Sequence, residues 1–190
     1  RKERRELKHK ERDLRSANER RKLFKRFLIL AAVVAAGYGI FYFLKSREGV
    51  GPDLSRAIPI LERDHVSPGA AVSDYNSNPP TSGRHWPDPA SRGVHDEELP
   101  DEILVHNLEH GEVWISYHPR IPEDIKTELR TIAKSFSKVV LTPRSKNDAD
   151  VALAAWGRLD KFNLESKPPD KSRVEDFITR YRNKGSELVP

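Results

Sequence analysis

The sequence predicts an α+β domain with a small mixed or antiparallel sheet, packed helices and a long ordered loop, preceded by one transmembrane helix. One uncharged apolar segment lies near the N-terminus, and short β-rich segments alternate with amphipathic segments in the second half. Between them lies a stretch rich in proline and glycine without periodicity. We therefore expect four parts: a basic tail (1–26), a transmembrane helix (27–44), a linker (45–57) and an α+β domain (58–190).

The apolar segment 27–44 contains 18 residues without a charge. At about 1.5 Å per residue, it is just long enough to cross a hydrocarbon core of roughly 30 Å. Phe27 at one end and Tyr42 and Phe43 at the other occupy the interfacial positions that aromatic residues prefer. The alternatives are a buried core helix and a secretory signal. No small-residue cleavage site follows the apolar run, which disfavours a signal, so we expect a retained anchor in the cell membrane.

Basic residues are concentrated before this segment. Residues 1–26 hold 13 Lys/Arg and 5 Asp/Glu, whereas the other 164 residues hold 21 and 24, so the net charge of +5 belongs to the tail. This argues against a nucleic-acid-binding domain. Residues 7–26 hold nine Lys/Arg against four in 45–64, which predicts a cytoplasmic tail and an extracytoplasmic domain.

The tail is expected to contact anionic lipid headgroups, in addition to the lipid around 27–44. A ribosomal, nucleic-acid or protein partner is the alternative, and a membrane-protein complex is a further possible partner of the chain. The sequence contains no cysteine, which excludes disulfides and thiolate chemistry.

Regular structure in the domain is expected after a long irregular segment, 58–94. The segment 99–110 has Pro100 near its start and Gly111 after its end, as a short helix requires. A second helix places Ile125, Leu129 and Ile132 on one face. The full set of predicted elements is helices at 99–110, 122–136 and 172–183 and strands at 112–118, 138–142 and 150–156, the last two joined by the polar turn PRSKNDA.

The sequence His106-Asn107-Leu108-Glu109-His110 carries the densest chemical signal. Residues at i and i+4 of a helix share one face about 6 Å apart, so His106 and His110 can point at one ion. Imidazole ligands suit zinc, copper, nickel and iron. The pair therefore indicates a transition-metal site, with zinc or copper as the expected ion.

A metal site needs three or four ligands, and the loop YNSNPPTSGRHW (75–86) can supply the third. Its prolines and turn residues restrict the backbone and would hold His85 in a fixed position. His65 is a fourth candidate. Glu109 is a candidate ligand, a hydrogen-bond acceptor for an imidazole, or a general base.

Other interpretations of the histidines stay open. They can be structural residues of an accessory or scaffolding subunit in a larger membrane complex, or line a metal-free catalytic or binding pocket. The sequence HNLEH also fits the H-x-x-E-H pattern of inverted zinc peptidases, but Gly111 ends the helix where that pattern requires a longer one. His95 and His118 lie outside the helical pair and are weaker candidates.

Together, the loop motif, LVHNLEHGEVWISYHP, the VVLTP and ALAAWGR segments and FITRYRNKG resemble a bacterial family catalogued as domain of unknown function 3105. The resemblance covers about residues 58–188. It implies an extracytoplasmic domain behind one membrane helix, with no known activity. The matching positions are His65, Tyr75, Pro79, Pro80, Thr81, Ser82, Gly83, His85, His106, Glu109, His110 and Gly111; Arg84 replaces a usual proline, and His95 a usual tyrosine.

Overall fold

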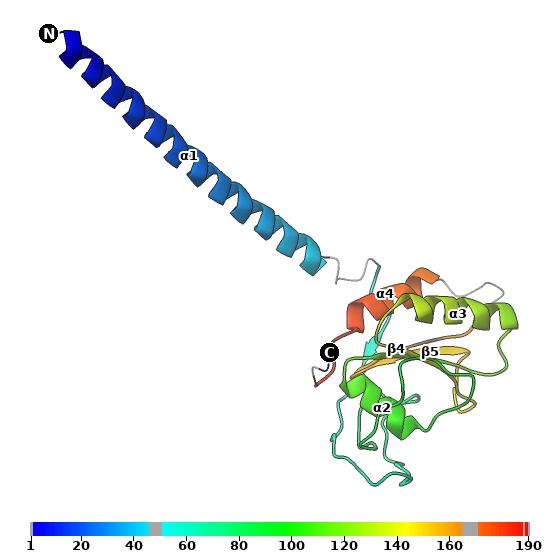
Figure 1. Cartoon of the computed structure of the whole chain (residues 1–190). Coiled ribbons are helices and arrows are strands. Elements are labelled where there is room, and N and C mark those ends of the chain that lie inside the picture. The colour runs from blue at the N-terminus through cyan, green and yellow to red at the C-terminus, as the bar shows by residue number, and fades with distance from the viewer. Residues whose placement is uncertain (1, 46–50, 165–170, 188, 190) are drawn as a thin grey trace. The chain divides into compact units, whose positions relative to one another are not determined.

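The computed structural model of the chain describes residues 2–45, 51–164, 171–187 and 189. It divides into two compact units, Arg1–Arg47 and Glu48–Pro190 (Figure 1). The first unit is a single helix, α1 (Lys2–Lys45). Its section Arg20–Phe43 is long and apolar enough to cross a membrane, and none of that section is buried in the structure. A signal sequence would pass the same test of length and composition.

The described residues of the second unit form three helices and one open six-stranded sheet. The helices are α2 (Asp101–Glu109), α3 (Glu123–Ser135) and α4 (Lys171–Tyr181). The strands are β1 (Arg56–Ala57), β2 (Gly93–Val94), β3 (Val113–Tyr117), β4 (Val139–Pro143), β5 (Val151–Ala155) and β6 (Arg158–Phe162). Their order is β1-β6-β5-β3-β4-β2, with β4 parallel to both β3 and β2 and the other pairs antiparallel. The predicted α+β class with a mixed sheet is confirmed.

Both faces of the sheet are covered, which makes the domain three layers thick. Helices α3 and α4 lie on one face and α2 on the other (Figure 1). Side chains of β3 alternate between the two cores: Val113 and Ile115 pack towards α3 and α4, whereas Trp114 packs with α2. The indole of Trp114 donates a buried hydrogen bond to Oγ1 of Thr142 over 2.9 Å. The chemically interesting residues lie on the α2 side.

The turn PRSKNDA joins β4 to β5 as expected, and β3 lies between these two strands in the sheet. Two features of the sheet differ from the sequence-based expectations. Strand β6 was not predicted, since its sequence RLDKF is mostly polar and follows β5 after a two-residue turn. Strand β1 pairs with β6 inside the segment that the sequence predicts to be a linker.

Candidate metal centre

Four side chains from three distant parts of the chain converge beside the end of α2. His65, His85, His106 and Glu109 each place one potential ligand atom within 4.8 Å of the others. The ring centroids of the three histidines lie 4.8 to 5.1 Å apart. His85, His106 and Glu109 are buried, whereas His65 is exposed. The group is therefore open to solvent on the His65 side.

The loop 75–86 holds His85 by packing rather than by regular structure. Pro79, Pro80, Thr81, Ser82 and Gly83 are all buried. Gly83 has φ +129, and a Cβ there would lie 2.9 Å from Cε1 of Tyr75, so no other residue fits without displacement. The Ser82 hydroxyl accepts a hydrogen bond from the N–H of Leu61 over 3.0 Å. These contacts fix the backbone two residues before His85.

A short parallel β-bridge brings His65 beside His85. The N–H of Val66 donates to the carbonyl of His85 over 2.8 Å, and the N–H of His85 donates to the carbonyl of Asp64 over 3.2 Å. Both hydrogen bonds join backbone atoms, so neither of them uses an imidazole nitrogen of the two histidines. The two rings meet edge to face.

The Nδ1 atom of His85 lies 2.8 Å from the carbonyl oxygen of Gly83 and must carry the proton, because a carbonyl only accepts. Its Nε2 atom lies 3.0 Å from Oε2 of Glu109. The two atoms are not aligned for a hydrogen bond, and this buried Nε2 has no hydrogen-bond partner within the described residues. With the proton on Nδ1, His85 therefore has an Nε2 lone pair that no described donor satisfies, beside a carboxylate oxygen.

His106 is oriented in the same way by the loop. Its Nδ1 donates to the carbonyl of Trp86 over 2.8 Å, which leaves Nε2 as the acceptor atom, 3.1 Å from Nε2 of His110. Burial lowers the pKa of His106; the bond to Trp86 opposes this, and the neighbouring imidazoles lower the pKa further. His106 is therefore uncharged at neutral pH, and its Nε2 atom is able to bind a metal ion. The backbone carbonyl of Trp86 thus orients His106.

Glu109 is held by a segment after α4 that sequence patterns do not connect to the site. Its Oε1 accepts a hydrogen bond from the Ser186 hydroxyl over 3.1 Å, and Nη1 of Arg63 lies 3.7 Å away. Gly185 packs so closely on the helix end that an added Cβ would overlap the carbonyl oxygen of Glu109. Neither Ser186 nor Arg63 was predicted to be a site residue, because no local sequence pattern distinguishes either of them.

His110 lies at the edge of the group rather than inside it. Its Nε2 is 3.1 Å from Nε2 of His106 and 3.5 Å from Oε2 of Glu187. It is the residue that ends α2, and Gly111 follows it with φ +75. The helix therefore presents His106 and Glu109 to the group, at spacing i and i+3, and leaves His110 beside them.

One protein family matches the part of the chain that contains these residues. Its pattern, described as a protein of unknown function (DUF3105), covers residues 65–189. The chain belongs to the DUF3105 family. No curated protein and no solved structure matches the chain.

The position of the group in the DUF3105 domain favours a cation. It lies at the C-terminal end of α2, where the helix dipole is negative, and Glu109 adds a buried carboxylate. The other two candidate histidines are engaged elsewhere: Nε2 of His95 contacts the carbonyl of Ser91, and Nδ1 of His118 accepts from the N–H of Arg120. Both lie outside the group formed by His65, His85, His106 and Glu109.

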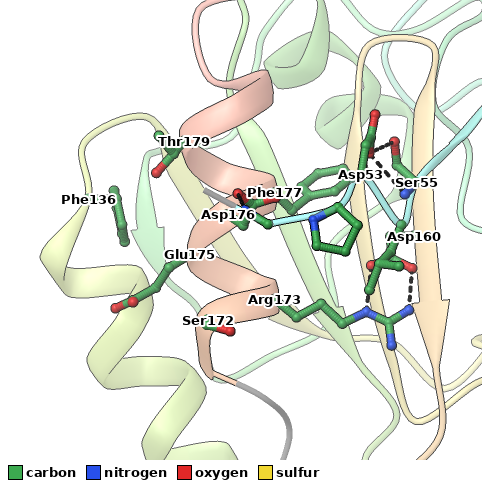
Figure 2. Close-up of a pocket in the computed structure, with 13 residues that line it drawn as sticks. Asp53, Ser55, Phe136, Asp160, Ser172, Arg173, Glu175, Asp176, Phe177 and Thr179 are labelled. Carbon is green, nitrogen blue, oxygen red and sulfur yellow. Dashed lines mark hydrogen bonds and ion pairs between the residues drawn. The ribbon is translucent and has the colours of Figure 1, made fainter. Parts of the chain in front are cut away.

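A cavity of about 580 Å³ in the DUF3105 domain lies apart from this group, between residues 51–55 and α4 (Figure 2). Its charged groups are already paired: Arg173 binds Asp160 through two hydrogen bonds of 2.8 and 2.6 Å, and Asp53 accepts from Ser55. Asp53 also accepts from the Tyr181 hydroxyl. The cavity thus attaches residues 51–55 to α4 and offers no comparable set of free donors.

Proposed function

We propose that this chain is a single-pass membrane protein whose extracytoplasmic domain binds one transition-metal ion, zinc or copper. The ligands are His65, His85, His106 and Glu109. The imidazole-rich donor set suits both metals and is poorly matched to magnesium or calcium, which prefer oxygen ligands.

The contact between His85 and Glu109 supports this proposal most directly. Nε2 of a neutral His85 and Oε2 of Glu109 are both acceptors, and at 3.0 Å apart in a buried site they require a positive charge nearby. Arg63 lies 3.7 Å from the other carboxylate oxygen, but its side chain is 58% exposed and its charge is screened by water. A proton on Nε2 of His85 would supply that charge, but its N–H would not point at Oε2. A metal ion in the centre of the group satisfies both atoms together with the Nε2 atom of His106.

The dimensions of the group fit one ion after a small closure. Ligands bound to zinc at about 2.0 to 2.1 Å lie about 3.4 Å apart in a tetrahedral site, and no two lie more than about 4.2 Å apart. The four ligand atoms lie within 4.8 Å of one another, and the exposed His65 is the ligand with most freedom to move inward. Four protein ligands leave no open position in a tetrahedral site, which favours holding an ion over metal-dependent hydrolysis.

The membrane location rests on α1. Its apolar side chains between Arg20 and Phe43 are exposed to a degree that a water-soluble unit does not tolerate without a covering lipid or protein. The excess of Lys/Arg before this section favours a cytoplasmic N-terminus. Because the chain has no cysteine, single substitutions Ser16→Cys and Ser73→Cys can report the side of each unit. In intact cells, a membrane-impermeant maleimide should label only the Ser73→Cys protein; labelling of Ser16→Cys alone would reverse the proposed orientation.

Elemental analysis tests the metal site. The full-length chain is expressed with added zinc or copper and purified in detergent, and we expect about one ion per chain. His65→Ala should lower the content without unfolding the protein, since His65 is exposed, and His118→Ala is the matched control. Less than about 0.1 ion per chain from metal-replete cells would contradict the proposal.

A further inference from the structure

His110 and Glu187 form a polar pair that leads from the surface to the proposed metal group. We infer that these two residues are transient ligands through which the ion enters and leaves the site, an inference that rests on the proposed metal binding. The site would then be an exchange site that loads from and unloads to the outside.

The hydrogen bond between the two helix histidines shows how an ion could pass. Because Nδ1 of His106 donates to Trp86, its Nε2 must accept, so Nε2 of His110 is the donor. An ion bound to His106 occupies that lone pair and removes the acceptor. The Nε2 proton of His110 then passes to water while Nδ1 takes a proton from water, so the ring stays neutral and its Nε2 lone pair is free for the same ion.

The separation of the two atoms permits transfer without a ligand-free intermediate. Nε2 of His110 and Nε2 of His106 lie 3.1 Å apart, within the spacing that two ligands of one ion can have. The ion can therefore bind His106 before it leaves His110. Each step exchanges one donor or water for another, and neither the charge nor the oxidation state of the ion changes.

Exposure falls along the path. The side chain of Glu187 is 51% exposed and that of His110 is 15% exposed, whereas His106 is buried. Oε2 of Glu187 lies 3.5 Å from Nε2 of His110, so the carboxylate can attract a cation and pass it inward. In the described part of the chain, the His110 imidazole has no other polar partner than His106 and Glu187. It is therefore free to reorient, unlike His85 and His106.

Stopped-flow kinetics with zinc tests the path. The full-length protein in detergent is loaded with Zn²⁺, and loading and chelator-driven release are followed with a fluorescent zinc chelator in wild type, Glu187→Gln and His110→Ala. Loading should be about tenfold slower in Glu187→Gln, because the carboxylate attracts the ion. His110→Ala should slow loading and release by about tenfold each, so that the dissociation constant is unchanged. Glu97→Gln and His95→Ala are the controls for an exposed carboxylate and a histidine outside the group.

The equilibrium measurement separates this inference from the proposed function. A wild-type protein that binds no zinc contradicts the metal site itself and, with it, the path. A wild type that binds zinc while His110→Ala weakens equilibrium binding and speeds release would make His110 a permanent ligand and overturn the path. Unchanged rates in both variants would overturn it as well.

Discussion

The Nε2 atom of His85 lies 3.0 Å from Oε2 of Glu109, and no hydrogen bond joins them. His85 donates its Nδ1 proton to the carbonyl of Gly83. Both facing atoms are acceptors when the imidazole is neutral, and both are buried. This relationship is the main support for the proposed cation site, and it leads to the first prediction.

Glu109→Gln should stabilise the metal-free protein and weaken metal binding. The neutral amide removes the repulsion between two buried acceptors that no hydrogen bond joins, and a buried polar group without a partner costs about 1 to 3 kcal/mol. The same change removes the negative charge that attracts the ion. Chemical denaturation with a chelator present and a zinc titration measure the two effects. If His85 and Glu109 were instead a buried ion pair, the substitution would destabilise the protein by about 3 to 5 kcal/mol.

Zinc or copper should raise the thermal stability of the full chain. A ligand that binds only the folded state at 100 times its dissociation constant adds about 2.7 kcal/mol. We expect the melting temperature to rise with added metal, to fall again after chelation, and to respond less in His65→Ala. Magnesium is the matched ionic control, because the donor set is mainly imidazole. An equal response to magnesium would contradict a specific site.

Gly185→Ala should destabilise the domain and loosen the metal group together. An added Cβ would overlap the carbonyl of Glu109 and the N–H of Gly111, both backbone atoms that cannot move aside easily. Overpacking of this kind costs about 1 to 3 kcal/mol or more. Gly51→Ala is the control, since a Cβ there meets nothing within 4 Å. Equal unfolding free energies for the two variants would show that the C-terminal segment does not brace Glu109.

Asp150→Asn should reduce stability at neutral pH but not in acid. Burial raises the pKa of Asp150, but hydrogen bonds from the N–H of Leu164 and from Arg120 outweigh it and place the pKa below its ordinary value of 3.8. As the pH falls, the unfolded chain therefore binds a proton at the Asp150 carboxylate before the folded protein does. The stabilisation by Asp150 is present above about pH 4 and is lost as the pH falls through the folded-state pKa. Unfolding free energies of wild type and variant should converge as the pH falls below the folded-state pKa of Asp150. Substitution of the exposed Asp88 by Asn is the control.

Local sequence patterns were sufficient for most elements of the fold. The face of Ile125, Leu129 and Ile132 predicts α3, and these three side chains are buried in the core as expected. Strand β3 follows from alternation and β-formers within EVWISYH. The order of the strands could not be predicted from such patterns. No feature of β4 or β5 alone shows that β3 separates them, because strand order depends on the crossover through α3.

The chemistry of the site was visible in part. The spacing of His106, Glu109 and His110 puts all three on one side of a short helix, and the restrained loop indicates that His85 has a fixed position. Their assignment as metal ligands stays a prediction. The structure adds that His85 and His106 have their Nδ1 atoms bound to the carbonyls of Gly83 and Trp86, so that Nε2 is the acceptor atom of each ring.

The sequence by itself determined the α+β class, the apolar N-terminal helix, the family and the residues able to carry the chemistry, because each depends on composition or on spacing along one element. Only the tertiary structure decided that Glu109 faces His85 while His110 turns towards Glu187. A helix face offers both i+3 and i+4 positions to a neighbour. Which of the two enters the group depends on contacts with Gly185 and Ser186. These residues follow α4, far along the chain, and no sequence pattern near α2 predicts their contacts.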